Sequence, residues 1–304
     1  MQVFNGSIVA IVTPMMADGQ VDYESLQNLI DWHIASGTNG IVSVGTTGES
    51  STLEIEEHLN VIKHTIDYSN SRIPIIAGTG GNSTKEAIDL TVESKILGAD
   101  GALLVTPYYN KPSQLGLIKH YEAVADAVDI PQILYNVPTR TACDLEVAST
   151  SVLANHKNIV GIKEALDDPY RIKELVKISK NTKDFIVLSG DDPTFFDSML
   201  AGSHGVISVA ANIFPKEVSS ICRNVLDGNV KEAEKLNHLL SSFYNYLFVE
   251  SNPIPVKWML AKMGRINNAI RLPLTELNET YHNDILSKLK ELEIFFFSNS
   301  LLET

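Results

Sequence analysis

The chain contains 304 residues, 44% of them hydrophobic and 20% charged, which is a composition typical of globular proteins. Its 24 Lys and Arg and 37 Asp and Glu residues give a net charge of −13, which argues against nucleic-acid and anionic-membrane partners because both attract clustered positive charge. No positive charge precedes the first apolar run, and no apolar run is long enough to cross a membrane, so we expect neither a signal peptide nor a membrane span. With only Cys143 and Cys222, we expect a cytoplasmic protein whose two thiols are reduced and buried.

Short, continuously apolar runs recur through the first two thirds of the chain. Runs that are apolar throughout, rather than at alternate positions, are typical of strands buried on both faces of a sheet. The segments between the runs carry apolar residues at helical spacing. The predicted strands are, in chain order, Ser7–Pro14, Gly40–Gly45, Ile73–Gly78, Gly101–Pro107, Pro131–Val137, Asn158–Ala165, Phe185–Gly190 and Gly205–Ala210.

Capping residues mark the ends of several predicted helices. Asp22 precedes one helix, and Ser83 with Glu86 forms a capping-box pattern before another. Asp192 stands before a proline, where we expect it to accept hydrogen bonds at a first helical turn. Gly98 occupies the position of a C-terminal cap. The helices predicted from periodicity therefore have matching start and stop signals.

The order of the predicted elements indicates the fold. Strict alternation of strands and helices implies parallel strands joined by right-handed crossovers. Eight such units favour a closed (β/α)8 barrel, the TIM barrel, in the α/β class. An open doubly wound sheet is the alternative, but the glycine-rich segment Ala77–Ser83 has serine at the third glycine position of the dinucleotide-binding motif.

The pattern changes after Ala211, where predicted helices follow one another with no strand between them. We predict that residues 1–225 form the barrel and that residues 226–304 form a C-terminal helical extension packed on it, as one structural unit. The run Phe295–Phe297 is either a buried helix end or an association surface. The predicted helices of this part are Pro215–Leu226, Val230–Phe248, Val256–Met263 and Leu274–Phe297.

Polar residues at the C-terminal ends of the predicted strands are the candidates for an active site, because (β/α)8 barrels build their sites there. In Gly45–Ser50 two glycines bracket two threonines before a helix, a turn that either binds a carboxylate through backbone N–H groups or caps the helix. Tyr108 and Tyr109 lie in a loop bounded by prolines. Tyr135 lies near the end of the fifth predicted strand, and Arg140 follows that strand. A buried tyrosine can relay protons and an arginine can bind a carboxylate, although each residue alone is more typical of packing or of a surface.

Lys163 is the most informative residue of the sequence. It stands late in the apolar run Asn158–Ala165, where a lysine is hard to explain by packing. Burial lowers the pKa of a lysine toward neutrality, and the free amine can then attack a ketone to form a Schiff base. A surface ion pair with Glu164 is the alternative, but neighbouring residues on a strand point to opposite faces. We therefore favour a nucleophilic role for Lys163.

Asp191 and Asp192 directly follow the seventh predicted strand and raise the question of a divalent metal. Two adjacent carboxylates suggest such a site, but no histidine or third carboxylate stands at ligand spacing. Asp192 is also explained as a helix cap. We therefore predict no metal site here.

Four motifs, in order along essentially the whole chain, resemble the dihydrodipicolinate synthase (4-hydroxy-tetrahydrodipicolinate synthase) family of the lysine-dependent pyruvate aldolases. They are Gly45–Glu49, Tyr135–Thr141, Gly161–Ala165 and Asn252–Lys257. The resemblance implies that pyruvate condenses with L-aspartate 4-semialdehyde in the diaminopimelate route to lysine. It also implies that no metal or organic cofactor is needed, because the imine on the protein itself withdraws electrons.

The resemblance implies a proton relay and an oligomer. Lys163 would form the imine with pyruvate, and Tyr135 would shuttle protons. Thr47 would link Tyr135 by hydrogen bond to Tyr109. In the family this second tyrosine enters the site of a neighbouring subunit, so we expect at least a dimer and usually a homotetramer, a dimer of dimers.

The resemblance also implies how the substrates are held. The amides of Thr46 and Thr47 would bind the pyruvate carboxylate. Arg140 would orient the carboxylate of the semialdehyde. The carbonyl of Ile207 would lie close to the Lys163 amine.

Lysine-sensitive relatives in this family bind L-lysine, the pathway product, between subunits and outside the catalytic pocket. We expect Glu86 to pair with the α-ammonium of lysine and His58 to meet its side-chain amine, although each alone is typical of a helix cap or a helix surface. Ile55 stands where several sensitive relatives carry a second histidine, so we expect weaker inhibition by L-lysine. The matching positions are Ser50, Ser51, His58, Asn82, Glu86 and Tyr108, of which Asn82 and Tyr108 would hold the carboxylate.

Two other functions stay open. N-acetylneuraminate lyases and keto-deoxy-sugar aldolases share the lysine chemistry, but Arg140 and the adjacent tyrosines argue against them. A non-catalytic barrel that only binds a metabolite is the alternative of another class. The presence of both Lys163 and Tyr135 argues against it.

Overall fold

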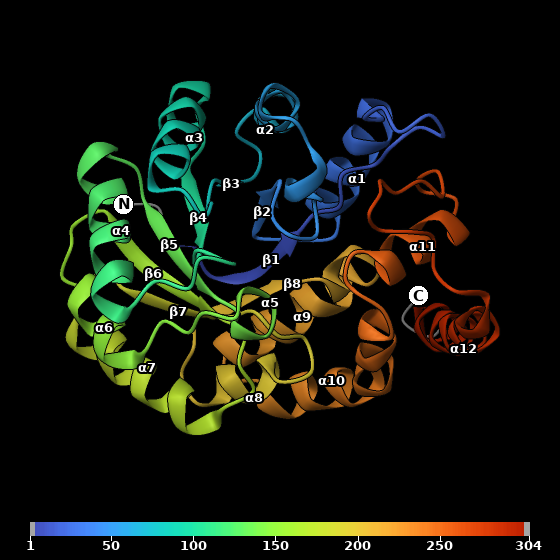
Figure 1. Ribbon diagram of the computed structural model, residues 1–304. Coiled ribbons are helices and arrows are strands. Elements are labelled where there is room, and N and C mark those ends of the chain that lie inside the picture. Colours follow the sequence, from blue (N-terminus) through green and yellow to red (C-terminus); the bar gives the residue numbers. More distant parts are fainter. Residues whose placement is uncertain (1–3, 301–304) are drawn as a thin grey trace.

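Eight parallel strands close into a barrel in the computed structural model, which describes the backbone of residues 4–300 and the side chains of residues 4–292 (Figure 1). Each strand pairs in parallel with its neighbours in the chain, and β1 pairs with β8 to close the ring. The predicted (β/α)8 barrel is therefore confirmed. The strands are β1 (Gly6–Ala10), β2 (Gly40–Ser43), β3 (Ile75–Gly78), β4 (Gly101–Val105), β5 (Gln132–Asn136), β6 (Ile159–Glu164), β7 (Ile186–Ser189) and β8 (Gly205–Ser208).

The strands are apolar throughout because both of their faces are buried. Ile8 and Val42 belong to the cluster that fills the barrel interior. Their neighbours Val9 and Ile41 belong to the larger cluster that includes the surrounding helices. A strand between two such clusters offers no solvent-facing position, which explains why the runs do not alternate.

Helices surround the barrel and connect successive strands (Figure 1). Asp22 and Ser83 cap two of them as predicted, because their side chains accept hydrogen bonds from the first-turn N–H groups. Gly98 ends one helix in the left-handed conformation, also as predicted. The helices between the strands are α1 (Tyr23–Ala35), the 3₁₀ turn η1 (Ser50–Thr52), α2 (Ile55–Ser69), α3 (Thr84–Leu97), α4 (Gln114–Ala127), α5 (Pro138–Thr141), α6 (Val147–Leu153), α7 (Pro169–Asn181) and α8 (Phe195–Leu200).

Asp192 is not a helix cap, contrary to the prediction. α8 begins after Thr194, two residues further on. The buried Asp192 carboxylate accepts hydrogen bonds from Ser208 Oγ at 2.5 Å and from the N–H groups of Val209 and Ala210 at 3.0 Å each. These donors are buried and need an acceptor. They therefore hydrogen-bond to the Asp192 carboxylate, which was predicted to accept from the first-turn N–H groups of the helix. Asp192 thereby joins the ends of β7 and β8.

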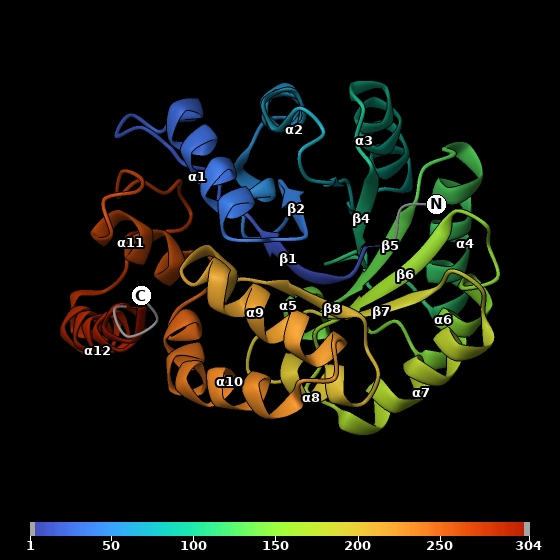
Figure 2. The same ribbon diagram turned by 180° about the vertical axis from the view of Figure 1, so that it is seen from behind.

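The C-terminal helices gather on one side of the barrel, beside α1 (Figures 1 and 2). One apolar cluster includes Val9 of β1 and Leu289 of the last helix, so the barrel and the extension share a continuous core. The boundary between residues 225 and 226 stays a prediction. The elements here are η2 (Ala210–Asn212), α9 (Pro215–Leu226), α10 (Val230–Tyr244), η3 (Asn245–Phe248), α11 (Ile254–Lys262), η4 (Glu279–Tyr281) and α12 (His282–Ser300).

The last helix begins later than predicted. Residues 274–278 are not helical, and α12 starts at His282 after η4. The Asn278 side chain accepts a hydrogen bond from the N–H of Thr280, and its own backbone is extended. A capping residue takes such a non-helical conformation, so the regular structure begins only after it.

Both cysteines, Cys143 and Cys222, are buried and free, as predicted. The side chains of Phe295–Phe297 lie outside the described residues. Across the helices that the structure describes, none combines the length and the apolar character needed to cross a membrane.

Candidate active site

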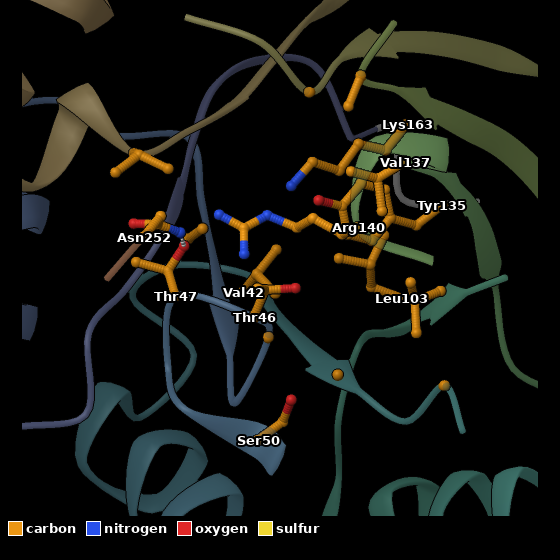
Figure 3. A pocket seen from close by; sticks show the side chains of 18 of the residues that line it. Val42, Thr46, Thr47, Ser50, Leu103, Tyr135, Val137, Arg140, Lys163 and Asn252 are labelled. Carbon is orange, nitrogen blue, oxygen red and sulfur yellow. Dashed lines mark hydrogen bonds between the residues drawn. The ribbon is translucent and has the colours of Figure 1, made fainter. Parts of the chain in front are cut away.

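A cavity of about 210 Å³ lies at the C-terminal ends of the strands, where the sequence predicted the site. Figure 3 shows its side chains converging from several elements. Lys163 and Tyr135 come from the neighbouring strands β6 and β5, and Arg140 comes from α5. Thr46 follows β2, and Asn252 belongs to the C-terminal extension. The cavity therefore unites residues from across the chain.

Lys163 is buried, and its amine points into this cavity (Figure 3). Its Nζ lies 4.1 Å from the centre of the Tyr135 ring. Burial lowers the pKa of Lys163 to about 7; the Asp192 carboxylate acts in the opposite direction, and the Arg140 guanidinium lowers the pKa further. The neutral amine of Lys163, which can act as a nucleophile, is therefore accessible near neutral pH.

Glu164 points away from Lys163, as strand geometry predicted. Its carboxylate accepts hydrogen bonds from Arg171 Nε at 2.6 Å and from Asn136 Nδ2 at 3.1 Å. These contacts lie on the opposite face of β6. Glu164 is thus paired with Arg171 rather than with the lysine beside it.

The turn Gly45–Glu49, here called the threonine turn, presents two threonines to the cavity. Glu49 has a left-handed backbone, with φ of 59°. This conformation is costly for residues other than glycine, so it marks a turn that is held by its surroundings. Within residues 4–300, no hydrogen bond occupies the backbone N–H groups of Thr46 and Thr47. These two groups can therefore bind an anion.

The two threonines of this turn have different contacts. Thr47 Oγ1 accepts a hydrogen bond from Asn252 Nδ2 at 2.9 Å, so this side chain faces the C-terminal extension (Figure 3). The side chain of Thr46 instead forms the hydrogen bond with Tyr135. Within this chain, Thr46 rather than Thr47 is therefore directed at Tyr135. The expectation that Thr47 links Tyr135 to Tyr109 of a neighbouring subunit stays a prediction.

Tyr135 and Arg140 provide a proton donor and a positive charge. Burial raises the pKa of Tyr135 to about 12, and the Arg140 guanidinium and the hydrogen bond with Thr46 act in the opposite direction. The phenol is therefore protonated at neutral pH and can donate a proton to a developing oxyanion. Arg140 extends its guanidinium into the cavity (Figure 3), where its planar fork suits a carboxylate.

Neither Tyr109 nor Ile207 is among the described residues that line this cavity. Tyr109 is 88% exposed, and its backbone is left-handed with φ of 73°. Ile207 is buried on β8, opposite Ile8 of β1 in the sheet register. Their predicted roles, in a neighbouring subunit's site and near the Lys163 amine, stay predictions.

Sequence reasoning missed the roles of Asp192 and Asn252. Burial raises the pKa of Asp192 to about 6, and its charge in turn raises the pKa of Lys163. Asp192 was visible in the sequence, but its position indicated a cap or a metal ligand. In the described part of the chain, no group of three or more His, Cys, Asp or Glu side chains could hold a metal ion. Asn252 was visible only as the first residue of a motif.

A second cavity, of about 270 Å³, adjoins the first and shares Thr46 and Arg140 with it. His58 Nε2 donates to the Gly78 carbonyl at 2.8 Å, which leaves Nδ1 as an acceptor, and burial lowers the pKa of His58. Asn82 is not among the described residues that line this cavity. Of the six positions predicted for lysine binding, those that line it are Ser50, Ser51, His58, Glu86 and Tyr108.

A lysine that can attack a ketone at neutral pH from the mouth of a (β/α)8 barrel is the nucleophile of the Schiff-base-forming aldolases, and this class accounts for the fold and the site together. Comparison with known proteins narrows the class. The chain matches the Dihydrodipicolinate synthetase family over residues 3–292 and belongs to that family.

Individual relatives agree with this assignment. The chain is 51% identical to the 4-hydroxy-tetrahydrodipicolinate synthase of Coxiella burnetii over 291 residues, which cover 96% of this chain and 99% of the relative. The crystal structure of the chloride-inhibited dihydrodipicolinate synthase from Acinetobacter baumannii, complexed with pyruvate, is 55% identical with a TM-score of 0.93, over 95% of this chain and 99% of that one. The crystal structure of DHDPS from Cyanidioschyzon merolae with lysine bound is 35% identical with a TM-score of 0.90, over 95% of this chain and 98% of that one.

Proposed function

We propose that this chain condenses pyruvate with L-aspartate 4-semialdehyde to give 4-hydroxy-tetrahydrodipicolinate, a lyase reaction of lysine biosynthesis through diaminopimelate. The observation that carries the proposal is the buried Lys163 amine, with a pKa of about 7, in a cavity with carboxylate-binding groups. Membership of the family and the pyruvate complex of the A. baumannii relative support pyruvate as the first substrate. The two free, buried thiols fit a cytoplasmic location.

The reaction begins at Lys163. Its neutral Nζ attacks the ketone carbon of pyruvate, and the resulting carbinolamine loses water to give a protonated imine. The N–H groups of Thr46 and Thr47 hold the pyruvate carboxylate during this step. Tyr135 gives a proton to the departing hydroxyl, which leaves as water. The iminium then withdraws electrons from the methyl group, which returns a proton to the Tyr135 phenolate and leaves an enamine.

The second substrate reacts with this enamine. The enamine carbon attacks the aldehyde carbon, and the aldehyde oxygen takes a proton from Tyr135, whose hydrogen bond with Thr46 leads the relay onward. Arg140 binds the carboxylate of the semialdehyde. The amino group of the semialdehyde then attacks the imine carbon, which closes the ring and releases the amine of Lys163.

Borohydride reduction in the presence of pyruvate tests the proposal. We expect a pyruvate-derived mass on the peptide that carries Lys163, no adduct and almost no turnover in Lys163→Ala, and an unchanged adduct in the surface control Lys183→Ala. Cleavage of N-acetylneuraminate or of a keto-deoxy sugar acid, without condensation, would favour the other aldolases. Failure of the wild type to form any adduct would favour a barrel that only binds a metabolite.

We extend the proposal to the assembly, a homotetramer built as a dimer of dimers in which Tyr109 enters the partner's cavity. A tyrosine that is 88% exposed has no role in its own cavity but can complete a relay of Tyr135 and Thr46 in a neighbour. Mixing inactive Lys163→Ala with impaired Tyr109→Phe subunits tests this, because a hybrid dimer contains one site with both groups intact. We expect activity to rise after subunit exchange; no rise in verified hybrids would refute the shared site.

We also propose that L-lysine binds in the second cavity. Glu86 lines this cavity and supplies a carboxylate for an ammonium, and Nδ1 of His58 supplies an acceptor. The C. merolae relative has lysine bound. The shared residues Thr46 and Arg140 offer a route by which a ligand in this cavity disturbs the proton relay.

The inhibition should be partial or non-competitive with pyruvate, because the two ligands occupy different cavities. Glu86→Ala should relieve it and leave uninhibited turnover nearly intact, whereas Glu93→Ala, on the same helix but outside the second cavity, should stay sensitive. Competition between L-lysine and pyruvate for Lys163 would contradict a separate site. Full wild-type activity at millimolar lysine would contradict inhibition by L-lysine.

A further inference from the structure

Three residues of the C-terminal extension contact the threonine turn. Asn252 Nδ2 donates to Thr47 Oγ1 at 2.9 Å. Lys257 Nζ donates to Glu49 Oε1, and the backbone N–H of Arg271 donates to Glu49 Oε2 at 3.3 Å. The two oxygens of one carboxylate are thus engaged by two separate points of the extension. The turn that offers its amides to pyruvate is held by the far end of the chain.

The ion pair between Glu49 and Lys257 is fully buried, with side chains 0% and 2% exposed. Removing two charges from water is costly, and a buried ion pair often gives no more stability than apolar residues of the same size. Stability alone therefore does not explain why this pair lies beside the active site. The orientation that it imposes on Glu49 offers a better explanation.

Glu49 depends on such support because its backbone is left-handed, with φ of 59° and ψ of 37°. A residue other than glycine keeps this conformation only where the surrounding contacts determine it. From the barrel side, Thr13 Oγ1 donates to the carbonyl of Gly48 at 2.7 Å. The threonine turn is therefore held between the segment that follows β1 and the C-terminal extension.

Arg271 connects the same anchor to the outer part of the barrel. Its guanidinium forms two hydrogen bonds with Glu57 of α2, each 2.6 Å long. It also donates to the carbonyls of Gly19 and Thr52 at 2.9 Å. A bidentate pair holds the planar guanidinium in one orientation. The backbone N–H of Arg271 that meets Glu49 is thereby held in place as well.

We infer that Lys257 and Arg271 are positioning residues that set the affinity for pyruvate by fixing the threonine turn through Glu49. The inference rests on the proposed function, in which the amides of this turn bind the pyruvate carboxylate. The semialdehyde is bound from α5 by Arg140, and the amine of Lys163 comes from β6. Loosening the anchor therefore weakens pyruvate binding and leaves the amine and the binding of the semialdehyde in place.

The pyruvate concentration that gives half-maximal borohydride trapping measures this effect without the second substrate. The double variant Glu49→Gln/Lys257→Met removes both charges, so that neither stays buried alone. We expect this concentration to rise about tenfold, the loss expected for a weakened charge-assisted hydrogen bond. The maximal adduct yield and the KM for the semialdehyde should be unchanged. An unchanged half-saturating concentration in the folded double variant would overturn the inference.

Arg271→Gln is the second variant, and it decides the question if the double variant does not fold, because it leaves the buried pair intact. We expect a rise of about threefold in the same concentration. Arg72→Gln is the matched control: it breaks the exposed 2.7 Å ion pair with Asp31 and should change nothing. Equal values for the two arginine variants would overturn the role of Arg271. A wild type that forms no adduct would instead refute the proposed function itself.

Discussion

The rate at which Lys163 forms an imine with pyruvate should depend on pH with a midpoint near 7. Burial lowers the pKa of this lysine from 10.5 to about 7. At pH 7 an ordinary lysine has about one neutral amine in three thousand molecules, whereas at a pKa of about 7 half are neutral. The gain in reactive amine is therefore roughly a thousandfold. Below the midpoint the rate should fall about tenfold per pH unit, because the ammonium is inert, and above it the rate should level off.

Trapping with cyanoborohydride at subsaturating pyruvate, followed by mass spectrometry from about pH 5 to pH 9, measures this profile. Two variants test its electrostatic origin. Asp192→Asn removes a negative charge that raises the pKa of Lys163, so the midpoint should move to lower pH. Arg140→Gln removes a positive charge that lowers this pKa, so the midpoint should move to higher pH.

A trapping rate that still rises through pH 9 would mean that Lys163 ionises as an ordinary lysine, and the burial argument would fail. Midpoints that move in the same direction in both variants would refute the charges assigned to Asp192 and Arg140 while leaving the nucleophile in place. Circular dichroism must accompany the measurement of Asp192→Asn, because this carboxylate also holds the end of β8.

Thr46→Val and Tyr135→Phe should each lower kcat by about 10²–10⁴-fold, and their losses should not multiply in the double variant, because one relay serves both; independent losses would contradict the relay. Arg140→Ala should raise the KM for the semialdehyde while trapping of pyruvate persists, and equal loss of both would mark a structural residue. Lys163→Met should abolish the adduct. Because it also removes a buried lysine whose pKa is lowered from 10.5 to about 7, it should raise the free energy of unfolding, measured in urea titrations, by about 4 kcal/mol at pH 7. Between pH 7 and pH 10.5 the unfolded wild type binds more protons than the folded one, so this gain should shrink as pH rises.

Periodicity was sufficient to predict the barrel, because a strand that is buried on both faces has no polar position and leaves a recognisable run. Lys163 could be found for the same reason: a charge inside such a run has no role in packing. The end of the chain was harder to predict. Apolar residues continue at helical spacing from Leu274, but Asn278 delays the helix to His282 by capping the turn before it.

Side-chain directions in the site depend on contacts that lie far apart in the sequence. Thr46 and Thr47 are chemically identical neighbours, and nothing local says which of them meets Tyr135. Their directions follow from a left-handed turn and from Asn252, 205 residues away along the chain. Asp192 has the local pattern of a helix cap, yet donors on the next strand bind its carboxylate. Which of these alternative hydrogen bonds forms is determined by residues that only the closed barrel brings together.

The buried lysines Lys163 and Lys257 show how the placement of carboxylates selects the nucleophile. Burial lowers the pKa of both. Glu49 contacts Lys257 directly and raises its pKa, which favours the inert ammonium. Lys163 has no such direct ion pair: the carboxylate beside it in the sequence, Glu164, is paired with Arg171. The charge of Asp192 raises the pKa of Lys163, but burial has the larger effect and lowers it to about 7. Peptide mapping after borohydride trapping should therefore find pyruvate on Lys163 and none on Lys257. A comparable adduct on Lys257 would show that burial alone, without regard to carboxylate pairing, makes a lysine reactive in this fold.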